Sequence, residues 1–156
     1  MKPMAWVISA LFALSMAVSC RDSASYLYTD FRSIPQSQWR PAQPITFDIS
    51  CRDSLTQRAQ LTVVVRHDNF YPHRDITLWV DVIDTAFRAT RHRLNIVLAD
   101  ENGQWRSRGF GSVYEASASL SAPVNPQAIR RVVMWNGIND SILYGISDVG
   151  LSISQQ

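Results

Sequence analysis

Lysine and cysteine are nearly missing from this sequence of 156 residues, which has one lysine, Lys2, and two cysteines, Cys20 and Cys51. Two cysteines leave a single possible disulfide. Charged residues make up only 18 % of the chain, with 15 basic and 13 acidic side chains. The net charge of +2 provides no broad basic surface, so a nucleic-acid-binding protein is excluded as an expectation. Heptad repeats are also missing, which excludes coiled coils, and the length fits one domain.

The N-terminal segment has the pattern of an export signal. Lys2 precedes an apolar run from Ala5 to Val18 that ends in Ala17-Val18-Ser19-Cys20. As a helix with ~1.5 Å rise per residue this run reaches roughly 21 Å, which is short of the ~30 Å hydrocarbon core that a transmembrane helix must cross. Small residues directly before a cysteine resemble the bacterial lipobox, in which cleavage before the cysteine is followed by acylation of its thiol and amino group.

These features predict three parts of the chain. We expect residues 1–19 to be a lipoprotein signal peptide, residues 20–25 a polar tether and residues 26–156 a folded domain, held to a lipid bilayer by acylated Cys20. The alternatives are an ordinary secreted protein, or a disulfide between Cys20 and Cys51 in an oxidising compartment. If Cys20 is acylated, Cys51 is a lone thiol, which we interpret as a small buried hydrophobe rather than a nucleophile.

Alternating apolar and polar residues dominate the rest of the sequence and predict β-strands. The pattern occurs near residues 25–31, 45–49, 61–66, 76–82, 94–98 and 149–153, and more weakly at 104–116 and 129–135. Asn102-Gly103 and Asn136-Gly137 are typical of turns between strands. Only residues 84–92 and 124–131 could form short helical turns. We therefore expect an all-β fold, a single antiparallel β-sandwich of the jelly-roll-like kind with about eight strands.

No catalytic or cofactor-binding motif is recognisable. His67, His73 and His92 are interpreted as surface or loop residues rather than ligands, so no metal site is predicted. Nucleophile elbows, phosphate loops and dinucleotide fingerprints are missing as well. The neighbouring carboxylates Asp100 and Glu101 could serve a hydrolase, but they fall in a predicted turn. We expect a protein that is not an enzyme and needs no cofactor.

The tryptophans of the domain suggest a second kind of function. Trp39, Trp79, Trp105 and Trp135 could form a platform on which sugar rings stack, which makes a carbohydrate-binding surface lipoprotein the alternative hypothesis. Such residues more often complete the core of a sandwich or cover its edge.

Three segments together carry a family resemblance: Arg66–Leu78, with its Tyr71-Pro72 pair, Leu98–Gly111, with Asn102-Gly103 and Trp105, and Gly145–Ile153. In their order and spacing, and over almost all of the chain after Cys20, they resemble the gliding motility lipoproteins of the GldH type from Bacteroidetes. The resemblance implies a non-enzymatic envelope component, lipid-anchored and expected in the outer membrane, that supports gliding or the associated secretion machinery through contacts with other envelope proteins. Candidate interaction residues in these segments and among the tryptophans are Arg66, Tyr71, Arg74, Trp79, Trp105 and Trp135.

Overall fold

The computed structural model describes residues 25–51, 57–106, 111–139 and 141–155, and strands make up nearly all of its regular structure. The expected signal peptide, most of the expected tether and Cys20 lie outside the described residues. The elements are β1 (Tyr26–Ser33), the 3-10 helix η1 (Pro35–Ser37), β2 (Gln38–Trp39), β3 (Ile45–Asp48), β4 (Ala59–His67), β5 (Asp75–Asp84), β6 (Ala89–Val97), β7 (Tyr114–Ser119), β8 (Ile129–Asn136), β9 (Leu143–Tyr144) and β10 (Ile146–Gln155). The prediction of an all-β domain is confirmed.

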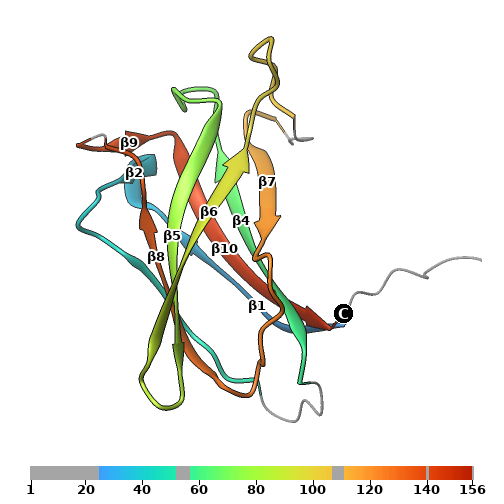
Figure 1. Cartoon of the computed structure of the whole chain (residues 1–156). Coiled ribbons are helices and arrows are strands. Elements are labelled where there is room, and N and C mark those ends of the chain that lie inside the picture. The colour runs from blue at the N-terminus through green and yellow to red at the C-terminus, as the bar shows by residue number, and fades with distance from the viewer. Residues whose placement is uncertain (1–24, 52–56, 107–110, 140, 156) are drawn as a thin grey trace, which may run out of the picture.

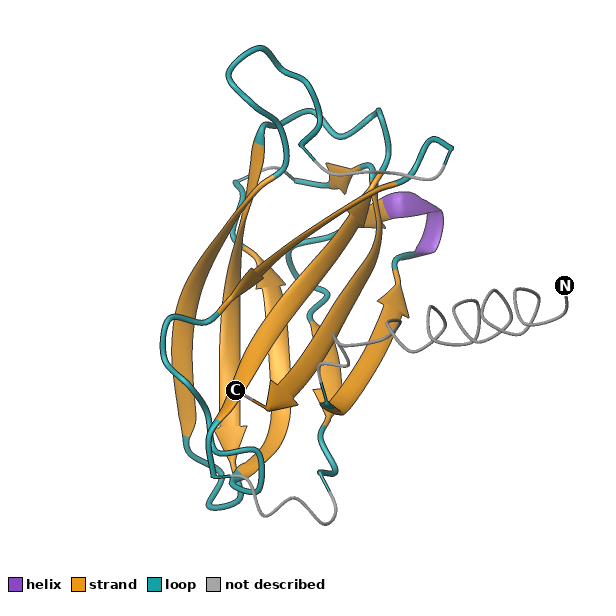
Figure 2. Cartoon of the chain, turned by 90° about the vertical axis from the view of Figure 1, so that its right-hand side faces the viewer, coloured by secondary structure: helices purple, strands orange, loops and turns teal. Residues whose placement is uncertain are grey.

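Two four-stranded antiparallel sheets pack face to face, as Figure 1 and Figure 2 show from two sides. The β4 sheet has the order β1-β10-β4-β7, the β5 sheet has the order β3-β8-β5-β6, and β2 pairs with β9 at one end. Consecutive long strands lie in opposite sheets, except for the β5–β6 hairpin. This interleaved order is that of a jelly roll, so the predicted jelly-roll-like sandwich is confirmed.

The core follows from the two-residue period of the strands. In β4 every second residue from Ala59 to His67 is buried, while the residues between them are partly exposed. In β5 the same alternation buries Ile76, Leu78 and Val80. Successive side chains of a strand point to opposite faces, so these inner faces meet in one apolar layer. The largest side chains in it include Trp39, Phe47, Met134, Leu143, Leu151 and Ile153.

The connections between strands gather at two ends of the sandwich because neighbouring strands are antiparallel. The proximal end, at the bottom of Figure 1, holds the start of β1 at Tyr26, the β5–β6 turn, the β7–β8 connection and the end of β10 at Gln155. The distal end holds η1 and residues 68–74, 98–106 and 137–139. The first described residues of the domain therefore lie at the proximal end.

Two local predictions are wrong. Residues 84–92 and 124–131 contain no helical turn but form strand ends and tight turns, whereas the 3-10 helix lies at Pro35–Ser37. In the β5–β6 turn, a carboxylate oxygen of Asp84 accepts hydrogen bonds from the backbone N–H groups of Ala86 and Arg88. An aspartate that satisfies two turn amides stabilises a tight reversal of the chain in place of a helix.

Two glycines of the C-terminal segment allow close packing of the backbone. Gly145 has φ +85°, and a Cβ atom there would lie 2.5 Å from the backbone nitrogen of Tyr71. A Cβ atom at Gly150 would overlap the ring of Phe31 on the neighbouring strand β1. These positions require glycine for steric reasons, and they account physically for two residues of the motif that carries the resemblance.

Candidate functional site

The outer face of the β5 sheet brings together two tryptophans that are 56 positions apart in the sequence. Trp79 on β5 is the register partner of Trp135 on β8 and, on its other side, of Arg93 on β6. Trp79 is 37 % exposed, and Trp135 is half-buried. We call the outward-facing residues of this sheet around the two indoles the tryptophan face; they are Thr77, Trp79, Asp81, Arg91, Arg93, Asn95, Val133 and Trp135.

A hydrogen-bonded carboxylate holds one half of this face in place. Asp81 accepts two hydrogen bonds from the guanidinium of Arg91, at 2.7 and 2.8 Å, and the indole N–H of Trp135 donates to its second oxygen at 3.2 Å. The hydrogen bond from Arg91 holds the pKa of Asp81 below its ordinary value, so the carboxylate is charged at neutral pH. The position of Trp135 is therefore fixed by the sheet rather than by a ligand.

The other half of the face has unused binding capacity. The indole of Trp79 extends toward Gly137, where an added Cβ atom would lie 3.2 Å from its nitrogen. Arg93 is exposed and makes no salt bridge with any described residue. The hydroxyl of Thr77 donates to Asn95 at 3.1 Å. An exposed indole beside an unpaired guanidinium can contact a partner by stacking, burial and hydrogen bonding at once.

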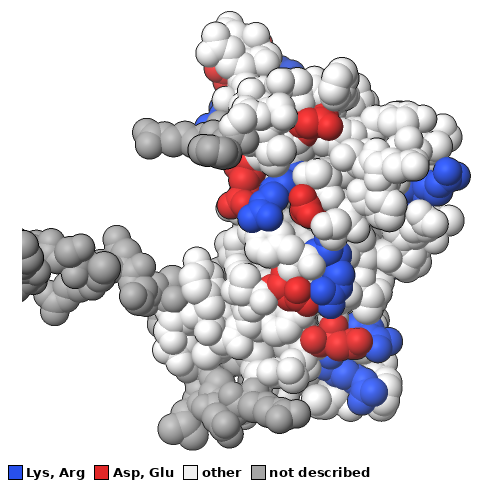
Figure 3. All heavy atoms as spheres, turned by 180° about the vertical axis from the view of Figure 1, so that it is seen from behind, with Lys and Arg blue, Asp and Glu red and all other residues white. Residues whose placement is uncertain are grey.

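Arg66 lies on the outer face of the other sheet, where its own neighbours engage it. Its Nε donates to Glu115 at 2.9 Å, and its guanidinium lies 4.2 Å from the ring centroid of Phe31. On the face of the molecule seen in Figure 3, acidic and basic side chains lie next to one another and form no field of one sign. The charges on that face balance locally, so they give little long-range attraction.

The remaining candidates lie at the distal end. Tyr71 is 3 % exposed and its hydroxyl donates to the backbone oxygen of Asp75, so its side chain is not available at the surface. Trp105 is half-buried, and its indole N–H donates to Asn69 at 3.0 Å. Arg74 is exposed in the loop before β5, where its carbonyl oxygen accepts from two backbone N–H groups. The structure therefore unites Trp79 and Trp135, and separates them from Arg66, Tyr71, Arg74 and Trp105.

His67 was expected at the surface or in a loop, and this expectation is wrong. The side chain is fully buried at the end of β4 because the strand's alternation directs it inward. It contacts the rings of Trp105 at 4.5 Å, Tyr114 at 5.5 Å and Tyr71 at 5.9 Å between centroids. Burial lowers the pKa of His67, so the ring is neutral at pH 7, and its buried Nε2 has no hydrogen-bond partner. The signal for burial was present in the sequence, since His67 continues the series Leu61, Val63, Val65.

Metal and acid–base chemistry find no constellation in the part of the chain that the structure describes. No group of three histidine, cysteine, aspartate or glutamate side chains converges there. Cys51 is a free, half-buried thiol packed against the core, and burial raises its pKa. Among the described residues, no helix is long and apolar enough to cross a membrane.

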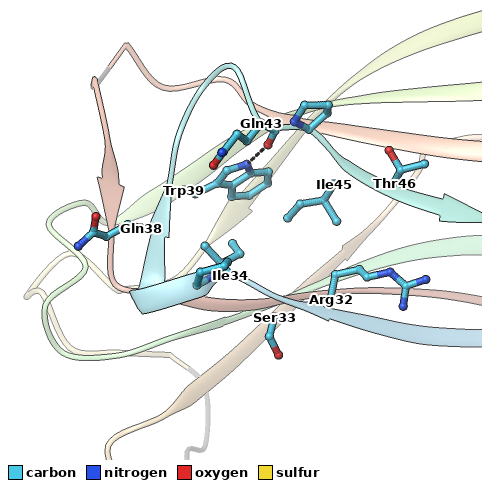
Figure 4. Close-up of a pocket in the computed structure, with 10 residues that line it drawn as sticks. Arg32, Ser33, Ile34, Gln38, Trp39, Gln43, Ile45 and Thr46 are labelled. Carbon is cyan, nitrogen blue, oxygen red and sulfur yellow. Dashed lines mark hydrogen bonds between the residues drawn. The ribbon is translucent and has the colours of Figure 1, made fainter.

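A pocket of about 240 Å³ opens between the edge strands β1 and β3 (Figure 4). Its apolar wall contains Ile34, Trp39 and Ile45, and the Trp39 indole donates to the backbone oxygen of Gln43 at 2.9 Å. Arg32 is the one charged residue that lines it, and its guanidinium forms a 2.6 Å salt bridge with Asp30. The pocket thus presents an apolar cleft without an acid–base pair.

Comparison with protein families identifies the kind of protein to which this sandwich belongs. A model of the GldH lipoprotein family matches residues 26–153, which is nearly the whole described domain. The chain belongs to the GldH lipoprotein family. The resemblance stated from the sequence motifs is thereby confirmed.

Two curated relatives of the GldH family match almost end to end at low identity. The "Gliding motility lipoprotein GldH" of Flavobacterium johnsoniae is 27 % identical over 154 residues, covering 94 % of this chain and 94 % of the relative. The "Gliding motility lipoprotein GldH homolog" of Christiangramia forsetii is 25 % identical over 154 residues, covering 93 % and 92 %. Membership in this lipoprotein family indicates a lipid-anchored protein of the cell envelope.

Proposed function

We propose that this GldH-family chain is an accessory component of gliding or secretion machinery, held at the outer membrane by acylated Cys20, and that it acts by binding another envelope protein rather than by catalysis. The observation that carries this proposal is the tryptophan face, where exposed Trp79 lies between Trp135 and unpaired Arg93. Tryptophan and arginine are the residues most enriched at the energetic centres of protein interfaces.

The construction of the face supports a preformed binding surface. Its side chains project from three adjacent strands with 28 to 32 contacts' worth of sheet pairing replaced here by a simple statement of register: Trp135, Trp79 and Arg93 are paired in a row across β8, β5 and β6. Because the Asp81 carboxylate already fixes Trp135, a partner needs to order little more than Trp79 and Arg93 on binding. Preorganisation of this kind raises affinity by lowering the entropy lost on association.

Photo-cross-linking tests this surface in the native host. We expect a protein with p-benzoylphenylalanine in place of Trp79 to form a light-dependent adduct with an envelope protein. The same replacement at Tyr144, which is 50 % exposed but lies on β9 at the distal end, is the matched control. No adduct at position 79, or the same adducts at both positions, would contradict the proposal.

Binding strength provides a second measurement once the adduct is identified. Trp79→Ala is expected to weaken binding of the captured protein by about 30-fold or more, as for an interface residue of hot-spot rank. Arg93→Glu should weaken it too, whereas Arg74→Glu in the loop before β5 should not. Unchanged circular dichroism of each variant separates lost binding from lost folding.

A carbohydrate-binding surface is the second candidate function, and the same face favours it for a specific reason. Thr77, Asn95 and Arg93 place hydrogen-bonding groups next to the exposed Trp79 ring, which is the arrangement that a stacked sugar uses. A glycan array distinguishes the two functions. Glycan binding that disappears in Trp79→Ala, without a protein adduct at position 79, would favour the sugar.

The anchor is tested independently with a clickable fatty acid in the native host. Wild type and Cys51→Ala should carry the label, and Cys20→Ala should lose it and leave the outer-membrane fraction. Cys51→Ala is the matched control because it removes the other cysteine of the chain. An unlabelled wild-type protein would refute the lipid anchor and favour secretion.

A further inference from the structure

The β5–β6 turn displays a phenylalanine in an unusual backbone conformation. Phe87 has φ +63° and is 71 % exposed. A bulky residue at positive φ is uncommon, and the left-handed region costs such a residue about 1–2 kcal/mol. An exposed aromatic ring in a strained turn is a feature that needs a physical explanation, because neither packing nor backbone preference favours it.

The side chain of Asp84 enforces this conformation. Its Oδ1 accepts the N–H groups of Ala86 and Arg88 at 2.8 and 2.9 Å, and its Oδ2 accepts Arg88 Nε at 2.9 Å. The backbone N–H of Phe87 donates to the Asp84 carbonyl oxygen at 3.0 Å, and Asp84 N–H donates to the Arg88 carbonyl oxygen at 3.0 Å. These bonds close the turn around residue 87, so the ring of Phe87 is held outside it.

Positive charge surrounds the exposed ring. The guanidinium of Arg130 lies 4.6 Å from the Phe87 ring centroid, and Arg130 forms no salt bridge with any described residue. The side chain of Arg88 is 82 % exposed beside the single carboxylate of Asp84. One aromatic ring with two guanidinium groups and one carboxylate is a small amphipathic tip with a net positive charge.

This tip lies at the end of the sandwich where the described chain begins. β1 starts there at Tyr26, which is 63 % exposed. From Cys20 to Tyr26 a fully extended chain spans at most about 20 Å, whereas a ten-residue strand such as β5 is roughly 33 Å long. An anchor at Cys20 therefore keeps the proximal end closer to the bilayer than the distal end can come by tether length alone.

We propose that the Asp84–Arg88 turn, together with Arg130, is a second membrane contact: the Phe87 ring enters the interfacial region of an anionic bilayer, and Arg88 and Arg130 contact lipid phosphates. The inference rests on the proposed anchoring at Cys20. Aromatic rings favour the boundary between headgroups and acyl chains, and arginines next to them are attracted by anionic lipid. The strained turn is explained by this contact, because it directs an apolar ring away from its own domain. With two attachment points the sandwich would be held in one orientation on the membrane, with the distal end directed away from it.

Depth-dependent fluorescence quenching tests the contact in the full acylated protein purified from the native host. Phe87→Trp and Phe70→Trp are placed in vesicles of phosphatidylcholine and phosphatidylglycerol whose acyl chains carry bromine, which quenches tryptophan at short range. Phe70 is the matched control because it is 83 % exposed in the loop after β4, at the distal end. Relative to wild type, the added fluorescence of Phe87→Trp should be quenched and that of Phe70→Trp should not.

The same samples separate the two proposals. Protein that floats with the vesicles while Phe87→Trp is unquenched, or quenched no more than Phe70→Trp, would overturn the membrane contact and leave the anchor standing. Protein that does not float would overturn both.

The charge dependence gives a second readout. In Phe87→Trp protein, Arg130→Gln should lower the ratio of contacting to non-contacting protein about fivefold on anionic vesicles, since one arginine near such a surface contributes a factor of that size. On pure phosphatidylcholine vesicles it should change the ratio little. An equal effect of Arg130→Gln on both kinds of vesicle would contradict the role of the phosphates.

Discussion

Gly145→Ala provides a sharp test of how the C-terminal segment is packed. The residue lies between β9 and β10 with φ +85°, and a Cβ atom would lie 2.5 Å from the nitrogen and 2.8 Å from the Cα of Tyr71. It would also lie 2.9 Å from Oδ1 of Asp68. Two of these three atoms belong to backbone, so a side-chain rotation cannot relieve the overlap.

The expected loss combines two costs. The left-handed conformation costs a non-glycine residue about 1–2 kcal/mol, and the smaller entropy of the unfolded alanine chain offsets about 0.4–1 kcal/mol of it. Overpacking against a rigid neighbour adds typically about 1–3 kcal/mol. We therefore expect Gly145→Ala to lower the free energy of unfolding by about 2–4 kcal/mol, out of the roughly 5–15 kcal/mol typical of a domain.

Gly103→Ala is the matched control because Gly103 has φ +77° but no atom within 4 Å of an added Cβ. It should cost only the conformational part, about 1 kcal/mol or less. Urea unfolding of both purified variants, followed by circular dichroism, compares them directly. With a slope of about 2 kcal/mol per molar urea, the two midpoints should differ by roughly 1 M. Equal midpoints would refute the steric argument, because the shared backbone strain would then account for the whole effect.

Three further perturbations test the core and the tryptophan face. Burial lowers the pKa of His67 below its ordinary value of 6.5, so the unfolded chain takes up a proton first and the free energy of unfolding should fall as pH falls below 6.5; urea titrations from pH 7 to 5 should show a flatter dependence for His67→Gln. Trp39→Phe removes the donor to Gln43 in a side chain only 2 % exposed, and should cost about 2–3 kcal/mol in the same assay. The Arg91 hydrogen bond lowers the pKa of Asp81, so its stabilisation is present above pH 4 and lost as pH falls through the folded pKa; Asp81→Asn should lose about 1 kcal/mol at pH 7 and show a weaker acid dependence.

The strands were predictable because a half-buried strand leaves a period-two pattern that needs no knowledge of its neighbours. The alternation in β4 and β5 matches their burial residue by residue, and the chain was assigned to its family by motifs whose glycines have steric roles. The weaker assignment at 104–116 was only partly right, since the described part shows an isolated bridge between Ala99 and Trp105 and then β7 from Tyr114. A turn with one bridging pair leaves almost no periodicity to detect.

Side-chain position at the ends of strands escaped prediction. His67 was expected outside the core although it continues the buried series of β4, because a polar residue type outweighed the strand's period. The short helical turns expected near residues 84–92 failed because the Asp84 carboxylate satisfies the turn amides that a helix would have used.

The sequence by itself determined the all-β class, the family and the expectation of a lipid anchor at Cys20, because local periodicity and short contiguous motifs encode them. Only the tertiary structure decided which residues share a surface. Trp79 and Trp135 meet because β5 pairs with β8 across 56 positions of sequence, and Tyr71 is withdrawn from the surface by the core. Strand order and register depend on contacts between distant segments, and no single segment carries that information.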